Sequence, residues 1–257
     1  MFVVRDHHAQ LAGEPLPRDL TADEVRALDA NGARFTAPRV GTVYATLLND
    51  RNALAALGDT LKTAPYAKPP AAPILYVKPR NTLVGHGAEV LVPDGAPGLR
   101  IGGSLGIVLG RVASHVSAAN ALDCVAGYTI VADLGVPNDG FFRPPVRDLI
   151  RDGFCVLGPC IVGERHVPAP DALRIGIRVG GQAPFTSTTA NSVRGVARLI
   201  ADVTEFMTLA PGDVLTLGVP WGAPVARAAD EISVAIADWP TLRLRLVPET
   251  ADEGAHA

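Results

Sequence analysis

The chain alternates short apolar runs, rich in β-branched residues, with turns built from proline and glycine. In the final run, residues 241–247, leucine alternates with arginine, which is typical of a strand with one face exposed. Gly180 and Gly181 predict a hairpin turn after the run at 173–179. Strands are predicted at residues 42–48, 73–79, 88–93, 105–112, 127–135, 154–164, 173–179, 214–220, 231–237 and 241–247. The pattern therefore predicts a mostly β domain.

A few segments have helical spacing instead. The predicted helices cover residues 21–28, 53–61, 117–127 and 193–209. Thr21 and Glu24 form a capping box that opens the first of them. Asn191 or Ser192 is expected to cap the last and longest, whose apolar stripe indicates ordinary core packing and not a cofactor site.

Composition and length indicate one principal domain. Residues 1–40 are polar and interrupted by proline, and we expect an N-terminal extension with a short helix, a domain at 41–248 and a flexible tail at 249–257. The net charge of −3, with dispersed acidic residues, argues against nucleic acid or an anionic membrane as partner. No apolar run is long enough for a signal peptide or a membrane span.

The cysteines and histidines give little support for a zinc site. Three cysteines are too few for a zinc knuckle, and an odd number makes a poor disulfide framework, so a cytoplasmic location is expected. His7 and His8 are candidate metal ligands, but beside a chain terminus solvation is the simpler interpretation.

Residues 102–106, GGSLG, match the G-x-S-x-G pattern that presents a catalytic serine in many hydrolases. A nucleophile elbow needs a strand before the serine and a helix after it, whereas a loop rich in proline and glycine precedes Ser104 and a β-rich run follows. Neither His115 nor His166 is placed near it by the sequence. A phosphate-binding loop fails for the same reason, because these glycines do not open a helix.

The order of the segments resembles the fumarylacetoacetate hydrolase family. The likeness is strongest to the isomerase/decarboxylase branch of aromatic-compound catabolism, and there to its N-terminal-type half, which some systems make as a separate subunit. The resemblance implies an α+β, mostly β fold, a mixed β-sandwich roll with few helices. The stretches that carry it, within residues 41–247, are LNDRNA, PILYVKPRNTLVGHG, GIVLGRV, AGYTIVADLG, RDGFCVLGP and TEFMTLAPGDVLTLGVPWG.

Members of this family use a divalent cation, Mg²⁺ or else Mn²⁺ or Ca²⁺, held by a Glu-x-Glu pair and an aspartate on the next strand. The resemblance places the Glu-x-Glu pair on Gly102 and Ser104, and the aspartate on Asp133. One carboxylate and a hydroxyl offer a hard cation too little negative charge. The resemblance thus implies a degraded metal site, with no cation bound by this chain.

Other family positions are also changed. The family's histidine after the first strand falls on Ala53, its lysine on Leu149, its arginine on Pro137 and the threonine of its Gly-Thr-Pro on Val219. Losing these groups together with two metal carboxylates argues against the family chemistry at this site.

The remaining candidates lie in or beside family site segments. Asp133 and Lys78 are the catalytic candidates for general acid/base work, and Arg80, Arg143 and His86 are the substrate-binding candidates. Each has a plainer alternative: solvation for Lys78 and Arg80, a loop position for His86, a turn cap for Asp133.

Several functions stay open at this point. The first is a subunit that acts on a ring-cleaved 5-oxo-pentene-tricarboxylate or its diene-dioate product, beside a homologous metal-bearing subunit or as a homodimer. Such a subunit would either have a structural role beside its partner or catalyse a tautomerase step that needs no metal. The others are a non-catalytic binding protein, a C–C bond hydrolase, and a shifted register in which Asp94, Asp133 and Asp139 hold a cation. Replacing Gly102 and Ser104 with glutamate is expected to create a Mg²⁺ or Mn²⁺ site, if the strand has room.

Overall fold

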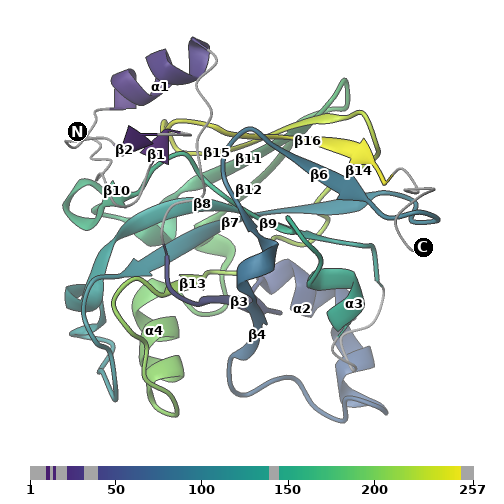
Figure 1. Ribbon diagram of the computed structural model, residues 1–257. Helices are drawn as coiled ribbons and strands as arrows, with labels where there is room; N and C mark the ends of the chain where they lie inside the picture. Colours follow the sequence, from purple (N-terminus) through teal and green to yellow (C-terminus); the bar gives the residue numbers. More distant parts are fainter. Residues whose placement is uncertain (1–9, 12–13, 16–21, 32–39, 139–144, 250–257) are drawn as a thin grey trace, which may run out of the picture.

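A computed structural model describes residues 10–11, 14–15, 22–31, 40–138 and 145–249 (Figure 1). They form two large curled sheets, a small two-stranded sheet of β1 (Gln10–Leu11) and β2 (Glu14–Pro15), and few helices, which confirms the predicted mostly β class. The larger sheet has the order β4 (Ile74–Lys78), β3 (Val43–Leu47), β13 (Val214–Thr216), β7 (Leu99–Leu109), β8 (Val125–Gly135), β9 (Cys155–Leu157) and β5 (Leu83–Val84), with β10 (Val162–Gly163) on β8 and β14 (Val225–Ala226) on β7. The smaller sheet has the order β12 (Phe185–Thr188), β11 (Arg174–Val179), β15 (Glu231–Ile236), β16 (Leu242–Pro248) and β6 (Ala88–Val92).

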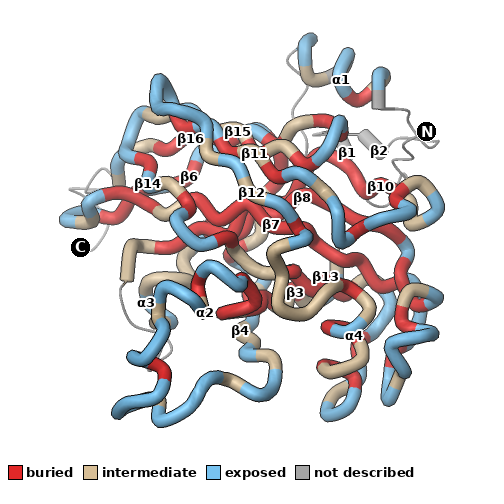
Figure 2. Tube along the Cα trace, turned by 180° about the vertical axis from the view of Figure 1, so that it is seen from behind, coloured by how far each residue is buried: buried red, intermediate tan, exposed pale blue. Residues whose placement is uncertain are grey.

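The two sheets pack face to face, and the long strands β7 and β8 form the buried centre (Figure 2). The sheets are in close contact at Gly103, where an added Cβ would lie 2.8 Å from Cγ1 of Val234 and 3.2 Å from Cδ1 of Ile177. The glycine therefore lets β15 and β11 approach the backbone of β7. On β16 the buried and exposed residues alternate, as the leucine and arginine pattern predicts.

The larger sheet curls until its two edges come close together. Strand β4 forms one edge and β5 the other, yet only Pro79 and the 3₁₀ turn Arg80–Thr82 separate them in the chain. Side chains of β4 consequently reach β8, four places away in the sheet order. This curling creates the cavity described below.

Four helices lie outside the sheets in the described part: α1 (Ala22–Ala30), α2 (Arg51–Leu57), α3 (Val146–Leu149) and α4 (Val196–Thr204) (Figure 1). The predicted first helix is present as α1. Helix α2 begins earlier than predicted, because the side chain of Asp50 caps it by accepting a hydrogen bond from the Ala53 N–H at 3.0 Å. None of the described helices is long and apolar enough to cross a membrane.

Several other predicted boundaries are wrong. The strand predicted at 154–164 is two short strands, β9 and β10, and the one predicted at 214–220 ends at Thr216. Strand β7 starts at Leu99 and not at residue 105, since pairing with β8 and β14 extends it through the glycines. The helix predicted at 117–127 is a single 3₁₀ turn, Ala121–Cys124. Helix α4 is shorter than predicted, and its N-cap is Gly195 in place of Asn191 or Ser192. Asp171 supplies the missing acceptor, 2.8 Å from the Val196 N–H, from a segment distant in sequence.

Candidate functional site

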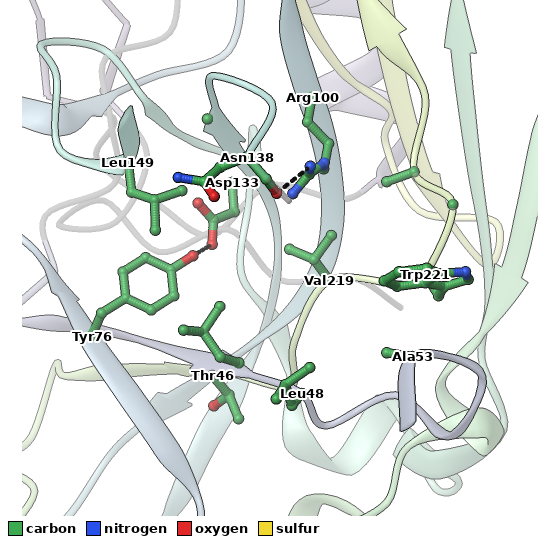
Figure 3. Close-up of a pocket in the computed structure, with 14 residues that line it drawn as sticks. Thr46, Leu48, Ala53, Tyr76, Arg100, Asp133, Asn138, Leu149, Val219 and Trp221 are labelled. Carbon is green, nitrogen blue, oxygen red and sulfur yellow. Dashed lines mark hydrogen bonds between the residues drawn. The ribbon is translucent and has the colours of Figure 1, made fainter. Parts of the chain in front are cut away.

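A cavity of about 480 Å³ opens beside the curled sheet (Figure 3). Its volume falls within the range of small-molecule sites. The walls come from β3, β4, the facing ends of β7 and β8, and the loop that follows β13. The lining residues are Thr46, Leu47, Leu48, Ala53, Tyr76, Arg100, Asp133, Gly135, Asn138, Leu149, Val219, Trp221, Gly222 and Ala223.

Asp133, on β8, is held by two side chains of β4. Nζ of Lys78 lies 2.6 Å from its Oδ1, and the hydroxyl of Tyr76 donates a hydrogen bond to its Oδ2. Lys78 is only 1% exposed and Asp133 5% exposed, so the ion pair is shielded from water. The structure thus brings together the two catalytic candidates of the sequence analysis.

Lys78 is fixed in place by backbone carbonyls. Its ammonium donates to the carbonyl oxygens of Leu134 at 3.1 Å, Leu149 at 2.7 Å and Phe154 at 3.1 Å. An ammonium has three donors, so these bonds use all of them. Oδ1 of Asp133 accordingly receives the positive charge of Lys78 without accepting a well-directed hydrogen bond. This arrangement makes Lys78 a counter-ion and a poor nucleophile.

Burial keeps two neighbouring groups protonated. Burial, and then the negative charge of Asp133, raise the pKa of Tyr76 well above its ordinary value. Burial likewise raises the pKa of the Cys155 thiol to about 12. Because the thiolate is the reactive form of cysteine, Cys155 is not a nucleophile near neutral pH.

Gly102 and Asp133 are direct partners in the antiparallel pair of β7 and β8, and Ser104 pairs with Val131. Directly opposed residues share a face of a sheet, as do residues two apart on a strand. Positions 102, 104 and 133 thus share one face, which is the arrangement that three metal carboxylates would need. The space at Gly102 is occupied, however: an added Cβ would lie 2.5 Å from Cγ2 of Val219 and 2.7 Å from the Asp133 carbonyl oxygen.

Ser104 has a structural role. Its side chain is fully buried inside β7, its Oγ accepts a hydrogen bond from the Gly218 N–H at 3.1 Å, and its hydroxyl donates to the carbonyl of Leu105 at 3.4 Å. The hydrogen bonds of His115 and His166 go to Ser114 and Arg165 instead. Ser104 therefore fixes the loop after β13 and is not a nucleophile.

Replacing Ser104 with alanine is expected to lower the free energy of unfolding by about 1–3 kcal/mol, because the Gly218 N–H loses its acceptor. Urea denaturation followed by circular dichroism measures the change. The matched control is Ser114→Ala, at an exposed hydroxyl, for which a change within about 0.5 kcal/mol is expected. Equal stability of the Ser104 variant and the wild type would contradict this structural role.

Two of the substrate-binding candidates, Arg80 and His86, do not line the cavity. Arg80 is exposed beyond the end of β4, and Arg143 lies outside the described residues. His86 lines a second cavity of about 220 Å³, where its Nε2 lies 2.8 Å from Oδ1 of Asp29 on α1. In the shifted-register alternative, Asp94 is exposed away from Asp133, and Asp139 lies outside the described residues, as do His7 and His8.

Among the wall residues that sequence reasoning missed are three large side chains, those of Tyr76, Arg100 and Trp221. A period-two signal was available for two of them. Tyr76 lies two residues before Lys78 on β4, and Arg100 lies two residues before Gly102 on β7, so each shares a face with a residue already singled out. Trp221 lies on an irregular loop, where no periodicity in the sequence indicates which way its side chain points.

The side chains present do not fit a divalent cation. In the described parts of the chain no three His, Cys, Asp or Glu side chains gather as a metal site. Asp133 is the one acidic residue in the described cavity wall, and the ammonium of Lys78 already neutralises it. A divalent cation bound there would face one compensated carboxylate and the guanidinium of Arg100.

The chain belongs to the fumarylacetoacetate hydrolase family. The family model described as Fumarylacetoacetate (FAA) hydrolase C-terminal matches residues 42–247. Three of the positions at which the resemblance predicts a departure from the family, Ala53, Leu149 and Val219, line the cavity beside Asp133. These three predicted departures therefore lie in one place.

Among curated proteins, the chain is 32% identical over 209 residues to the 4-hydroxyphenylacetate degradation bifunctional isomerase/decarboxylase of Escherichia coli. The match covers 81% of this chain and 48% of that protein, so the chain spans about half the length of this relative. Among solved structures, 2-hydroxyhepta-2,4-diene-1,7-dioate isomerase from Mycobacterium marinum is 26% identical with a TM-score of 0.71, covering 92% of this chain and 83% of that one.

A more distant structure shares the fold. Fumarylpyruvate hydrolase from Pseudomonas aeruginosa, solved in complex with Mn²⁺ and pyruvate, is 20% identical with a TM-score of 0.71, covering 84% of this chain and 92% of that one.

Proposed function

We propose that this chain is a subunit of an isomerase/decarboxylase of 4-hydroxyphenylacetate (homoprotocatechuate) catabolism and depends on a homologous, metal-bearing subunit for the chemistry. The observation that carries the proposal is the neutralised Asp133. When bound, a divalent cation assists the reactions of this family by stabilising the negative charge of the enolate. With Asp133 paired to Lys78 at 2.6 Å, the described wall of the cavity offers that cation no uncompensated carboxylate.

The comparisons support the choice of pathway and of a two-part enzyme. The curated relative has about twice the length that the match covers, which leaves room for a second, equivalent half. The proposed substrates are 5-oxopent-3-ene-1,2,5-tricarboxylate and its product 2-hydroxyhepta-2,4-diene-1,7-dioate. The second of these is named in the description of the isomerase that this chain resembles at 26% identity.

The test compares the purified chain alone with a mixture that contains a homologous chain bearing Glu-x-Glu and the aspartate. The chain alone is expected to show no Mg²⁺-dependent release of CO₂ from the tricarboxylate. In the mixture we expect a complex on gel filtration, and about a tenfold or greater change in the partner's rate. As the matched pair, Asp133→Asn in this chain is expected to leave the Mg²⁺ dependence unchanged, whereas removing the partner's aspartate abolishes activity.

Two outcomes would overturn the proposal. Turnover by the chain alone that requires Mg²⁺ and disappears in chelator would show an active metal site here. Failure of the chain to bind the homologue or alter its rate would leave the non-catalytic alternative. The second candidate is a non-catalytic protein. It is favoured because Ala53, Leu149 and Val219, which line the cavity, have no group that could act as an acid or a base.

A further inference from the structure

The cavity beside Asp133 has an excess of positive charge in its described wall. Lys78 cancels the charge of Asp133 across 2.6 Å, which leaves the guanidinium of Arg100 as the uncompensated charge. Among the ion pairs of the described residues, none involves Arg100. A wall of this kind attracts an anion, which is the reverse of what a cation site requires.

Arg100 is held so that its guanidinium faces the cavity. Its backbone lies between two strands, paired with Gly135 of β8 and with Val225 of β14. Its Nη2 donates to the carbonyl oxygen of Asn138 at 3.1 Å, which anchors one arm of the planar group (Figure 3). A guanidinium has five N–H donors in a fork that matches a carboxylate. Among the described residues only Asn138 accepts a hydrogen bond from this guanidinium, so its other donors can bind a ligand.

The rest of the wall is flat and largely apolar. Figure 3 shows the ring of Tyr76 and the indole of Trp221 on opposite sides of the cavity, with Val219 between them. Trp221 is 44% exposed, although large aromatic side chains are usually buried. Aromatic faces separated by aliphatic groups suit a planar, conjugated ligand.

We propose that this cavity binds a small, planar, unsaturated carboxylate without any metal, with Arg100 as the carboxylate-binding residue and Trp221 as the aromatic wall. The conjugated ligand class rests on the proposed function, since the substrates named there are unsaturated keto-enol carboxylates. Binding by Arg100 takes the place of coordination to a cation. The partner subunit is not needed for it.

The experiment titrates the full chain, in buffer containing EDTA, with trans,trans-hexa-2,4-dienedioate by calorimetry. One site per chain is expected, and Arg100→Gln is expected to weaken binding about tenfold or more, as loss of a charged hydrogen-bonding group does. The matched control is Arg111→Gln, at an exposed arginine outside the cavity wall, for which the affinity stays within twofold. Circular dichroism verifies that both variants fold.

Tryptophan fluorescence locates the ligand. Trp221 and Trp239 are the two tryptophans, and Trp239 is buried outside the cavity wall, so quenching by the ligand is expected to disappear in Trp221→Phe. Absence of binding to the wild type, binding only after Mg²⁺ is added, or equal affinity of the Arg100 variant would each overturn the inference. These measurements use the chain alone, so they can contradict the inference whatever the result of the mixing experiment above.

Discussion

Replacing Lys78 with methionine is expected to lower the free energy of unfolding by about 3–5 kcal/mol at pH 7. The ammonium is fully buried, pairs with Asp133 at 2.6 Å and satisfies three backbone carbonyls. Methionine fills a similar volume but leaves the carboxylate and the carbonyls without a cation or donor. Urea denaturation followed by circular dichroism measures the loss.

The control for this prediction is Lys62→Met, which removes an exposed ion pair to Asp59 and is expected to change the free energy of unfolding by less than about 1 kcal/mol. If Lys78→Met does not fold, the double variant with Asp133→Asn keeps the prediction testable. It is expected to be more stable than Lys78→Met, since the buried charge is then gone. A loss below about 1 kcal/mol for Lys78→Met would contradict the assigned role of the ion pair.

Replacing both Gly102 and Ser104 with glutamate is expected to lower the free energy of unfolding by about 4 kcal/mol or more, without creating a Mg²⁺ site. The condition that the strand has room is not met. The new Cβ at position 102 would lie 2.5 Å from Cγ2 of Val219, and the change at position 104 removes the acceptor of the Gly218 N–H. Thermal unfolding and calorimetry with Mg²⁺ measure the two effects.

Gly176→Glu is the control for this pair, because an added Cβ at Gly176 on β11 meets no atom within 4 Å. A change of less than about 1 kcal/mol is expected there. Adding Val219→Gly to the double variant is expected to restore part of the lost stability, since it removes the nearest obstructing side chain. A double variant as stable as the wild type that binds Mg²⁺ would show that the space at Gly102 is not filled.

The strands were predictable where their residues alternate or stay apolar, because those patterns depend only on neighbours in the chain. The strand through residues 102–104 was predicted to start too late, since glycine lowers strand propensity and only pairing with β8 and β14 overrides it. The cap of α4 was missed because its acceptor, Asp171, comes from a distant segment.

By itself the sequence determined the β class and the family resemblance, and that resemblance predicts that Gly102 and Ser104 stand where the family has its two glutamates. It also nominated Lys78 and Asp133, since both lie in recognisable segments. Only the tertiary structure decided that these two form a buried ion pair, that Val219 fills the space at Gly102, and that Arg100 faces the cavity. The reason is physical. The curling of the larger sheet brings β4 against β8, and no local pattern records a contact between strands so far apart in the sheet.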